Sequence, residues 1–249
     1  MDQIPPGPPP PVPPLHESLQ TPQLHEVPWR AREGIVVAFF GLLTGGFFSL
    51  LVATRFDKGD PTLQLLVVLL LEGSLGFWVW LWVKLRHQVG LRELGVRFRP
   101  SDIGAGVLAA LLGLGVGAAI TSIVLSIAKS VSHKVVTTPQ QLPTIDRNPQ
   151  WVLAFFAVVV VAPIAEELFF RGFLYQALRR WRGVTQGIAL SALIFALAHV
   201  SPLIIPSIFA LGIILAYVFE KRGSLAATMA AHMSYNLIGF IAIVASSRH

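Results

Sequence analysis

The chain has 249 residues, of which 54% are hydrophobic and only 13% are charged. An ordinary soluble domain carries about 25% charged residues, so 19 basic and 13 acidic side chains are too few to cover a soluble protein of this size. The composition therefore predicts a membrane protein. The absence of cysteine excludes disulfides, cysteine-ligated zinc and thiol catalysis. Basic residues that orient membrane helices explain the net charge of +6, so we expect no nucleic-acid partner.

Residues 1–30 differ from the rest of the chain, because they contain ten of its 18 prolines and almost no apolar periodicity. Such a segment favours polyproline II and buries no core. It lacks the basic start and apolar stretch of a signal peptide. We interpret it as a disordered cytoplasmic tail, with a ligand for a proline-reading partner as the alternative.

Long apolar runs begin at Ile35. A helix needs about 20 residues to cross a bilayer, and lipid offers no partner for unpaired backbone groups. The predicted spans are residues 35–54, 63–83, 103–128, 151–178, 187–201, 203–220 and 224–245. The fold class is therefore all-α, a polytopic transmembrane bundle of about seven spans. The fifth and sixth spans are short and are separated by Ser201 and Pro202.

Basic residues predict the orientation. They cluster before the first span, in residues 84–99, in residues 179–182 and at residues 221–222, which all lie on one side of a seven-span chain. Lys and Arg mark the cytoplasmic side. We therefore expect a multi-pass protein of a bacterial cytoplasmic membrane, with the N-terminus in the cytoplasm and the loop around Lys134 outside. Residues 31–99 form two N-terminal helices with a basic loop, and residues 100–249 form the core.

Ionisable residues inside the apolar spans need an explanation, because each costs about 2.5–3.5 kcal/mol at the bilayer centre on insertion scales. These residues, with one asparagine beside them, are Glu72, Glu166, Glu167, Arg171, His199, His232 and Asn236. At 1.5 Å per residue, Glu166 lies about 18 Å from the cytoplasmic end of its span, His199 about 20 Å and His232 about 12 Å. Three helices thus carry polar groups to similar depths, and we expect these groups to converge.

The helical phase separates the two adjacent glutamates. Glu167 and Arg171 are four residues apart with the acid first, which favours an ion pair. Glu166 is about 140° away from Arg171 around the helix and points elsewhere. Pro163 removes one backbone hydrogen bond and is expected to kink the helix beside Glu166.

Two histidines on separate helices, with a free glutamate on a third, fit acid–base catalysis or a metal site. Asn236 lies one turn after His232, on the same face. Phe195 lies one turn before His199 and is expected to shield it from lipid. Glu72 has no partner in its own span, so we interpret it as a packing or cavity residue and not as a catalyst.

Three motifs carry a resemblance to a known family. Residues 163–172, which include Glu166, Glu167 and Arg171, resemble the E-E-x-x-x-R motif of the CPBP intramembrane proteases. This family processes CAAX-prenyl proteins and bacteriocins, and is also called Abi. Residues 195–199 match its F-x-x-x-H motif, and residues 232–236 match its H-x-x-x-N motif. The resemblance covers about residues 100–245.

The resemblance implies an endopeptidase, similar to type II CAAX prenyl endopeptidases, whose active site opens toward the cytoplasmic leaflet. It makes Glu166 the base that activates water and His199 a residue that holds this water. His232 and Asn236 would stabilise the oxyanion, with Glu167, Arg171 and Phe195 in support. The substrate would be a peptide or membrane protein in the lipid bilayer, cleaved by CAAX-like C-terminal or peptide processing.

Two mechanisms fit these residues. In one, Glu166, His199 and His232 bind zinc with an open fourth position. In the other, Glu166 activates water without a metal, and the absence of an H-E-x-x-H motif favours this version. Only the first mechanism requires a cofactor, which would be zinc.

Two other functions would also place polar groups in a membrane. A non-catalytic adaptor or self-immunity protein on the same scaffold would not need the buried glutamate and both histidines. A transporter would show paired polar sites in two repeated halves, whereas the polar sites here concentrate in the C-terminal half.

Overall fold

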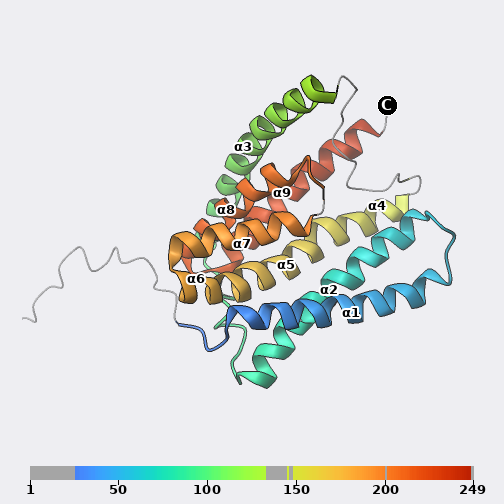
Figure 1. Cartoon of the computed structure of the whole chain (residues 1–249). Helices are drawn as coiled ribbons and strands as arrows, with labels where there is room; N and C mark the ends of the chain where they lie inside the picture. Colours follow the sequence, from blue (N-terminus) through green and yellow to red (C-terminus); the bar gives the residue numbers. More distant parts are fainter. Residues whose placement is uncertain (1–25, 133–144, 146–147, 200, 248–249) are drawn as a thin grey trace, which may run out of the picture.

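The computed structural model describes residues 26–132, 145, 148–199 and 201–247 (Figure 1). Most of the proline-rich segment, Lys134 and the loop around it lie outside these residues. The described part of the chain contains helices and no strands, which confirms the all-α fold class.

The described residues form a series of helices. Their bounds are α1 (Ala31–Ala53), α2 (Pro61–Arg86), α3 (Pro100–Ser132), α4 (Asn148–Ala154), η2 (Phe155–Val161), α5 (Ala162–Glu167), η3 (Leu168–Tyr175), α6 (Gln176–Arg182), α7 (Val184–Ala198), α8 (Ile205–Arg222) and α9 (Leu225–Ser246). The segments η2 and η3 are π-helical. Because α4, η2, α5, η3 and α6 are continuous, the described residues form seven rods, as the sequence predicts.

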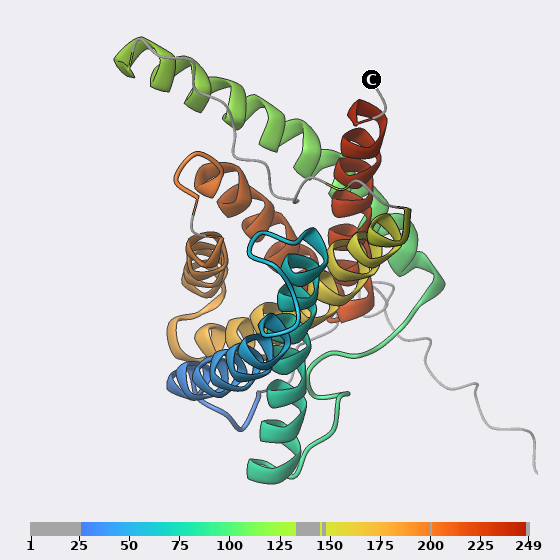
Figure 2. The same cartoon turned by 90° about the vertical axis from the view of Figure 1, so that its right-hand side faces the viewer.

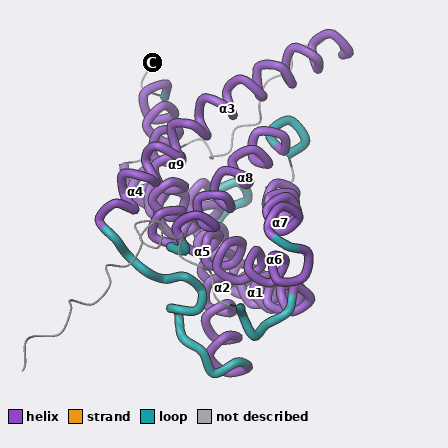
Figure 3. Tube along the Cα trace, turned by 90° about the vertical axis from the view of Figure 1, so that its left-hand side faces the viewer, coloured by secondary structure: helices purple, strands orange, loops and turns teal. Residues whose placement is uncertain are grey.

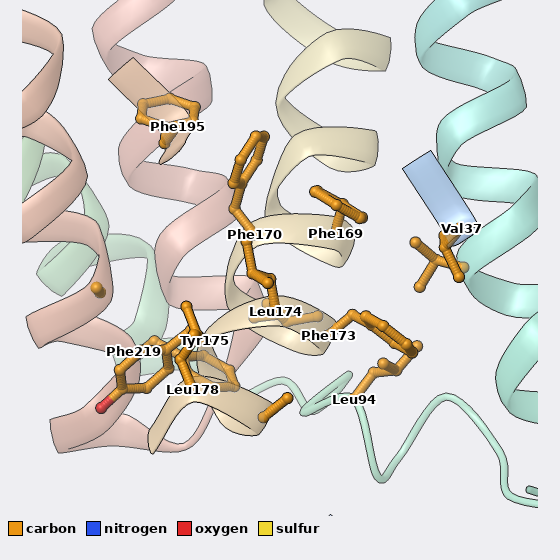
Figure 4. Close-up of a cluster of buried hydrophobic side chains, with 14 of the residues drawn as sticks. Val37, Leu94, Phe169, Phe170, Phe173, Leu174, Tyr175, Leu178, Phe195 and Phe219 are labelled. Atoms are coloured by element: carbon orange, nitrogen blue, oxygen red, sulfur yellow. The ribbon is translucent and has the colours of Figure 1, made fainter. Parts of the chain in front are cut away.

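The rod from α4 to α6 is the centre of the bundle, and we call it the central helix. It packs against α2 on one side, and against α7 and α9 on the others. Its aromatic and aliphatic side chains meet Val37 of α1, Phe195 of α7 and Phe219 of α8 (Figure 4). The core therefore surrounds the segment that carries the predicted glutamates.

Two groups of helices flank the central helix. Helices α1 and α2 form a hairpin on one side, and α3 lies across α8 and α9 on the other (Figures 1 and 2). The C-terminal part of α3 projects beyond the bundle in both views. Polar caps mark several helix ends. Asp60, for example, accepts a hydrogen bond of 2.7 Å from the backbone N–H of Thr62 at the start of α2.

The chain reverses sharply between α6 and α7. Gly183 takes φ of 80°, a left-handed conformation that a residue with a side chain adopts only at a cost. Gly187 then lies so close to Arg179 that a Cβ would be 2.9 Å from its backbone. These two glycines hold α7 against the central helix, and α7 carries Phe195.

Five of the seven rods are long and apolar enough to cross a membrane: α1, α2, α3, the central helix and α9. Helix α7 has only 15 residues, and α8 ends in the charged residues Glu220, Lys221 and Arg222. The fifth and sixth predicted spans therefore exist as helices but do not meet the length and composition of a span. The chain is an integral membrane protein.

Candidate active site

The central helix carries Glu166 and Glu167 in a short α-helical stretch between two π-helical ones. π-helical turns are rare and frequently occur at functional sites. At the end of η2 the backbone N–H of Ala162 bonds to the carbonyl of Ala157, five residues back. The next residue in this register is Pro163, which has no N–H. The disturbance that the sequence predicts at Pro163 therefore leaves the carbonyl of Val158 without a donor in its own helix.

Asn236 on α9 supplies that donor. Its Nδ2 atom lies 2.8 Å from the carbonyl oxygen of Val158. A buried carbonyl without a partner is costly, so this bond ties α9 to the irregular part of the central helix. An amide nitrogen carries two N–H groups, and the second one remains for another acceptor.

Glu167 and Arg171 form the ion pair that their spacing predicts. The Nη1 atom of Arg171 lies 2.7 Å from Oε1 of Glu167, and both side chains are completely buried. The guanidinium carbon also lies 4.4 Å from the ring centre of Phe195, which is a favourable cation–π distance. This pair holds the central helix against α7.

His232 on α9 lies between the two glutamates. Its Nδ1 atom is 2.9 Å from Oε1 of Glu167, and its Nε2 atom is 3.7 Å from Oε2 of Glu166. Because a carboxylate only accepts hydrogen bonds, the bond to Glu167 assigns a proton to Nδ1. Nε2 therefore faces Glu166. The bond to Glu167 thus fixes the orientation of the ring.

His199 lies at the C-terminal end of α7. Its Nδ1 atom is 2.9 Å from the carbonyl oxygen of Phe195. A carbonyl only accepts, so this bond assigns the proton to Nδ1 and leaves the lone pair of Nε2 available. His199 is therefore prepared to accept a hydrogen bond rather than to donate one.

Phe195 is not a shield toward lipid, as the sequence suggested, because its exposed fraction is 0%. Its ring centre lies 4.8 Å from that of His199 and 5.8 Å from that of His232. Arg171 covers the same ring. Phe195 thus brings the two histidines together and separates them from the guanidinium. The reason for the difference is that α7 turns this face toward the central helix instead of the bilayer.

The salt-bridge partner of Glu166 among the described residues is His232 at 3.7 Å, whereas Glu167 has Arg171 at 2.7 Å. The Oε2 atom of Glu166 is buried and has no hydrogen bond in this part of the chain, although 14% of its side chain is exposed. Its carboxyl group also interacts electrostatically with Glu72 of α2. The sequence interpretation of Glu72 as a packing or cavity residue did not anticipate this electrostatic interaction. The signal was present, since an acid in an apolar span requires a partner.

Close packing explains how Glu72 reaches Glu166. A Cβ on Gly76, one turn further along α2, would lie 3.4 Å from Ala165. Such an approach of two helices needs small residues on both sides. Helix α2, which the sequence assigned to the N-terminal region, therefore lies beside the candidate site.

The proposed zinc ligands do not form a metal site in the described residues. No group of three or more His, Asp or Glu side chains has the arrangement that would hold a metal ion there. One ring nitrogen of His232 is bonded to Glu167, and one of His199 is bonded to a carbonyl. These bonds fix the orientation of both rings and leave Nε2 of each free, an arrangement that suits hydrogen bonding to water or substrate and is also the one found in histidines that bind metals.

Comparison with known proteins gives a family-model match to the part of the chain that carries these residues. Residues 148–238 match the family model described as type II CAAX prenyl endopeptidase Rce1-like. The matched segment begins in α4, ends in α9 and includes Glu166, His199 and Asn236. Comparison with curated proteins and with solved structures found no significant match.

Proposed function

We propose that the protein is an intramembrane endopeptidase that uses Glu166 to activate water, because residues 148–238 match the model of type II CAAX prenyl endopeptidases, Rce1-like. Its substrate is a peptide or a membrane protein, and CAAX-like C-terminal processing is the reaction that the family suggests.

The observation that carries this proposal is the contrast between the adjacent glutamates. Glu167 is neutralised by Arg171 at 2.7 Å and bonded to His232, so it is engaged in structure. Glu166 has a buried oxygen without a hydrogen bond in the described chain, 3.7 Å from Nε2 of His232. A carboxylate that is partly removed from water and lacks the close arginine partner of Glu167 is suited to accept a proton from water.

The reaction follows from these groups. Glu166 takes one proton from a water molecule while Nε2 of His199 accepts a hydrogen bond from the same water. The water oxygen bonds to the scissile carbonyl carbon, and the carbonyl electrons move to its oxygen. When the tetrahedral intermediate collapses, the C–N bond breaks and Glu166 returns its proton to the leaving amine. The products are a carboxylic acid and an amine, and Glu166 is again ionised.

His232 and Asn236 are the proposed donors to the oxyanion. A charged His232 presents an N–H at Nε2, and Glu167 stabilises this charge from the other side of the ring. Asn236 offers the amide N–H that Val158 does not use. Oriented donors of this kind are strongest where water is excluded. No step in this scheme needs a metal.

The basic clusters support a cytoplasmic position for the site. The central helix ends at Arg179, Arg180 and Arg182, and α8 ends at Lys221 and Arg222. Both clusters belong to the side that the positive-inside rule places in the cytoplasm. Substrates would therefore enter from the inner leaflet.

The direct test compares membrane peptides from cells that contain the wild-type protein or Glu166→Gln. The substitution removes the base but keeps the shape. Substrate precursors should accumulate in the Glu166→Gln cells, and their cleaved products should disappear. Glu26→Gln is the matched control, because Glu26 is exposed at the edge of the described chain, and this control should leave the peptides unchanged. If Glu166→Gln cells have the wild-type peptides, Glu166 is not the base, and the non-catalytic adaptor becomes the better interpretation.

A further inference from the structure

A pocket lies at the basic end of the bundle, away from the glutamates. Its volume is about 620 Å³, and Trp29, Arg30, Arg32, Arg180 and Trp181 contribute to its lining. This volume is within the range of sites for small molecules, about 300–1,000 Å³. It lies where the start of α1 meets α6, which are neighbours in the structure (Figure 3). We call it the arginine pocket.

The arginine pocket has an excess of positive charge. Three guanidinium groups line it, and no carboxylate does. Within the described residues, Arg30 and Arg32 form no ion pair and Arg180 donates only to the backbone carbonyl of Val27. The nearby Glu33 accepts from Trp82 and His87 at Oε2 and from the backbone N–H of Arg30 at Oε1, and it forms no ion pair with the pocket's guanidinium groups. Guanidinium groups without carboxylates match phosphate oxygens in charge and geometry.

The wall of the pocket is held in place. Trp29 is completely buried, its ring stacks on Phe173 at 5.2 Å, and its indole N–H donates to the Phe173 carbonyl at 2.9 Å. Arg180 fixes the carbonyl of Val27 just before it. These contacts order the chain that carries Arg30 and Arg32 against the central helix. The arginine pocket is therefore formed without a ligand.

The position of the pocket identifies the source of the phosphate. Helix α1 begins at Ala31 and the central helix ends at Arg182, so the pocket lies at the membrane boundary of two spans. Trp181 is 60% exposed there, and the guanidinium of Arg182 lies 4.0 Å from its ring. Exposed tryptophan and arginine are typical of the headgroup level. At this depth the abundant phosphates belong to lipids.

We propose that the arginine pocket binds the phosphate headgroup of an anionic phospholipid. Arg30 and Arg32 contact the phosphate oxygens, and Trp181 borders the lipid. Basic pockets between helices on the cytoplasmic side bind anionic headgroups in this way. The site is separate from Glu166 and does not depend on peptidase activity.

The test uses the purified full-length protein and phosphatidylglycerol as the probe. The protein is reconstituted in phosphatidylcholine bilayers with and without phosphatidylglycerol, and retained lipids are counted by native mass spectrometry after transfer to detergent. The wild-type protein should retain phosphatidylglycerol in preference to phosphatidylcholine. The double variant Arg30→Gln/Arg32→Gln should bind it about 30-fold more weakly, at about fivefold for each arginine. Arg86→Gln is the control, because Arg86 is an exposed arginine on the same side of the bundle and outside the pocket.

Three results would overturn the proposal. Equal retention of the two lipids by the wild-type protein would exclude a headgroup site, and this arm needs no variant to fold. Wild-type retention by the double variant would exclude the two arginines. Inorganic phosphate that displaces phosphatidylglycerol at equal concentration would assign the pocket to free phosphate instead. The unfolding temperature of the double variant in phosphatidylcholine should equal that of the wild type, because neither side chain makes an ion pair in the described structure.

Discussion

Removing one charge from the buried Glu167–Arg171 pair should destabilise the protein, and the structure predicts which partner matters more. In Glu167→Gln, the guanidinium loses its ion pair. It keeps the carbonyl of Gly212 at 3.4 Å and the rings of Phe195 at 4.4 Å and Phe170 at 6.0 Å. In Arg171→Met, the Glu167 carboxylate keeps its hydrogen bond from Nδ1 of His232 at 2.9 Å. Glu167→Gln should therefore be the more harmful change.

The magnitude follows from the complete burial of both side chains. Breaking a buried pair by removing one partner costs about 3–5 kcal/mol. In a chain of 150–250 residues, 1 kcal/mol lowers the unfolding temperature by about 2–4 °C. Glu167→Gln should therefore lower it by about 6–20 °C, and Arg171→Met by less. The double variant leaves no unpaired charge and should recover much of the loss.

The assay is thermal unfolding of the purified variants in one detergent, followed by tryptophan fluorescence. A double-mutant cycle gives the coupling between the two side chains. Wild-type unfolding temperature in Glu167→Gln would refute the reasoning. So would a double variant that is less stable than either single variant, because this would mean that the two charges do not compensate one another.

Three further outcomes are expected. Asn236→Ala should lower the cleavage rate about 100- to 1,000-fold through loss of an oxyanion donor. It should also cost about 1–3 kcal/mol of stability, because the Val158 carbonyl loses its donor. Rate and unfolding measurements separate the two effects, and a normal rate would exclude the oxyanion role. His232→Ala should reduce the rate by a similar factor, and a smaller loss would exclude it as a donor. A reporter fused near Arg92 should be cytoplasmic and one near Lys134 external, and the reverse would invert the topology.

Composition and the length of apolar runs predicted the helical membrane fold, because lipid permits few alternatives for a spanning backbone. The limits of that reasoning appear at α7 and α8. Their hydrophobicity is close to that of a span, but α7 ends at Ala198 and α8 begins only at Ile205. Hydropathy gives the lengths of these helices, 15 and 18 residues, but does not show whether they cross the membrane.

Helical phase predicted the contact between Glu167 and Arg171, because both lie on one helix and four residues apart. The contact between His232 and Glu167 joins residues on two helices, 65 positions apart. Its geometry depends on how α9 packs against the central helix, and a single sequence does not reveal this packing. The same is true of Glu72, whose approach to Glu166 depends on the close packing of Gly76 and Ala165.

The bond between Asn236 and Val158 depends both on the local sequence of the central helix and on the packing of α9 against it. The sequence marks Pro163 as a residue without an N–H, so a carbonyl one turn earlier must lose a donor. Which carbonyl is affected depends on the π-helical register of η2, and which residue compensates depends on α9. The sequence analysis had placed Asn236 beside the substrate alone, and the structure gives it a second partner.

The most direct test of the account is the cleavage rate of the purified enzyme, measured on a peptide identified from the membrane comparison, for the wild type and for Glu166→Gln after exhaustive chelation. If Glu166 activates water directly, the chelated wild type should keep its rate, and folded Glu166→Gln should have no measurable activity. Undiminished activity in Glu166→Gln would exclude it as the base. Loss of wild-type activity on chelation, with recovery on addition of stoichiometric zinc, would show that a metal activates the water instead.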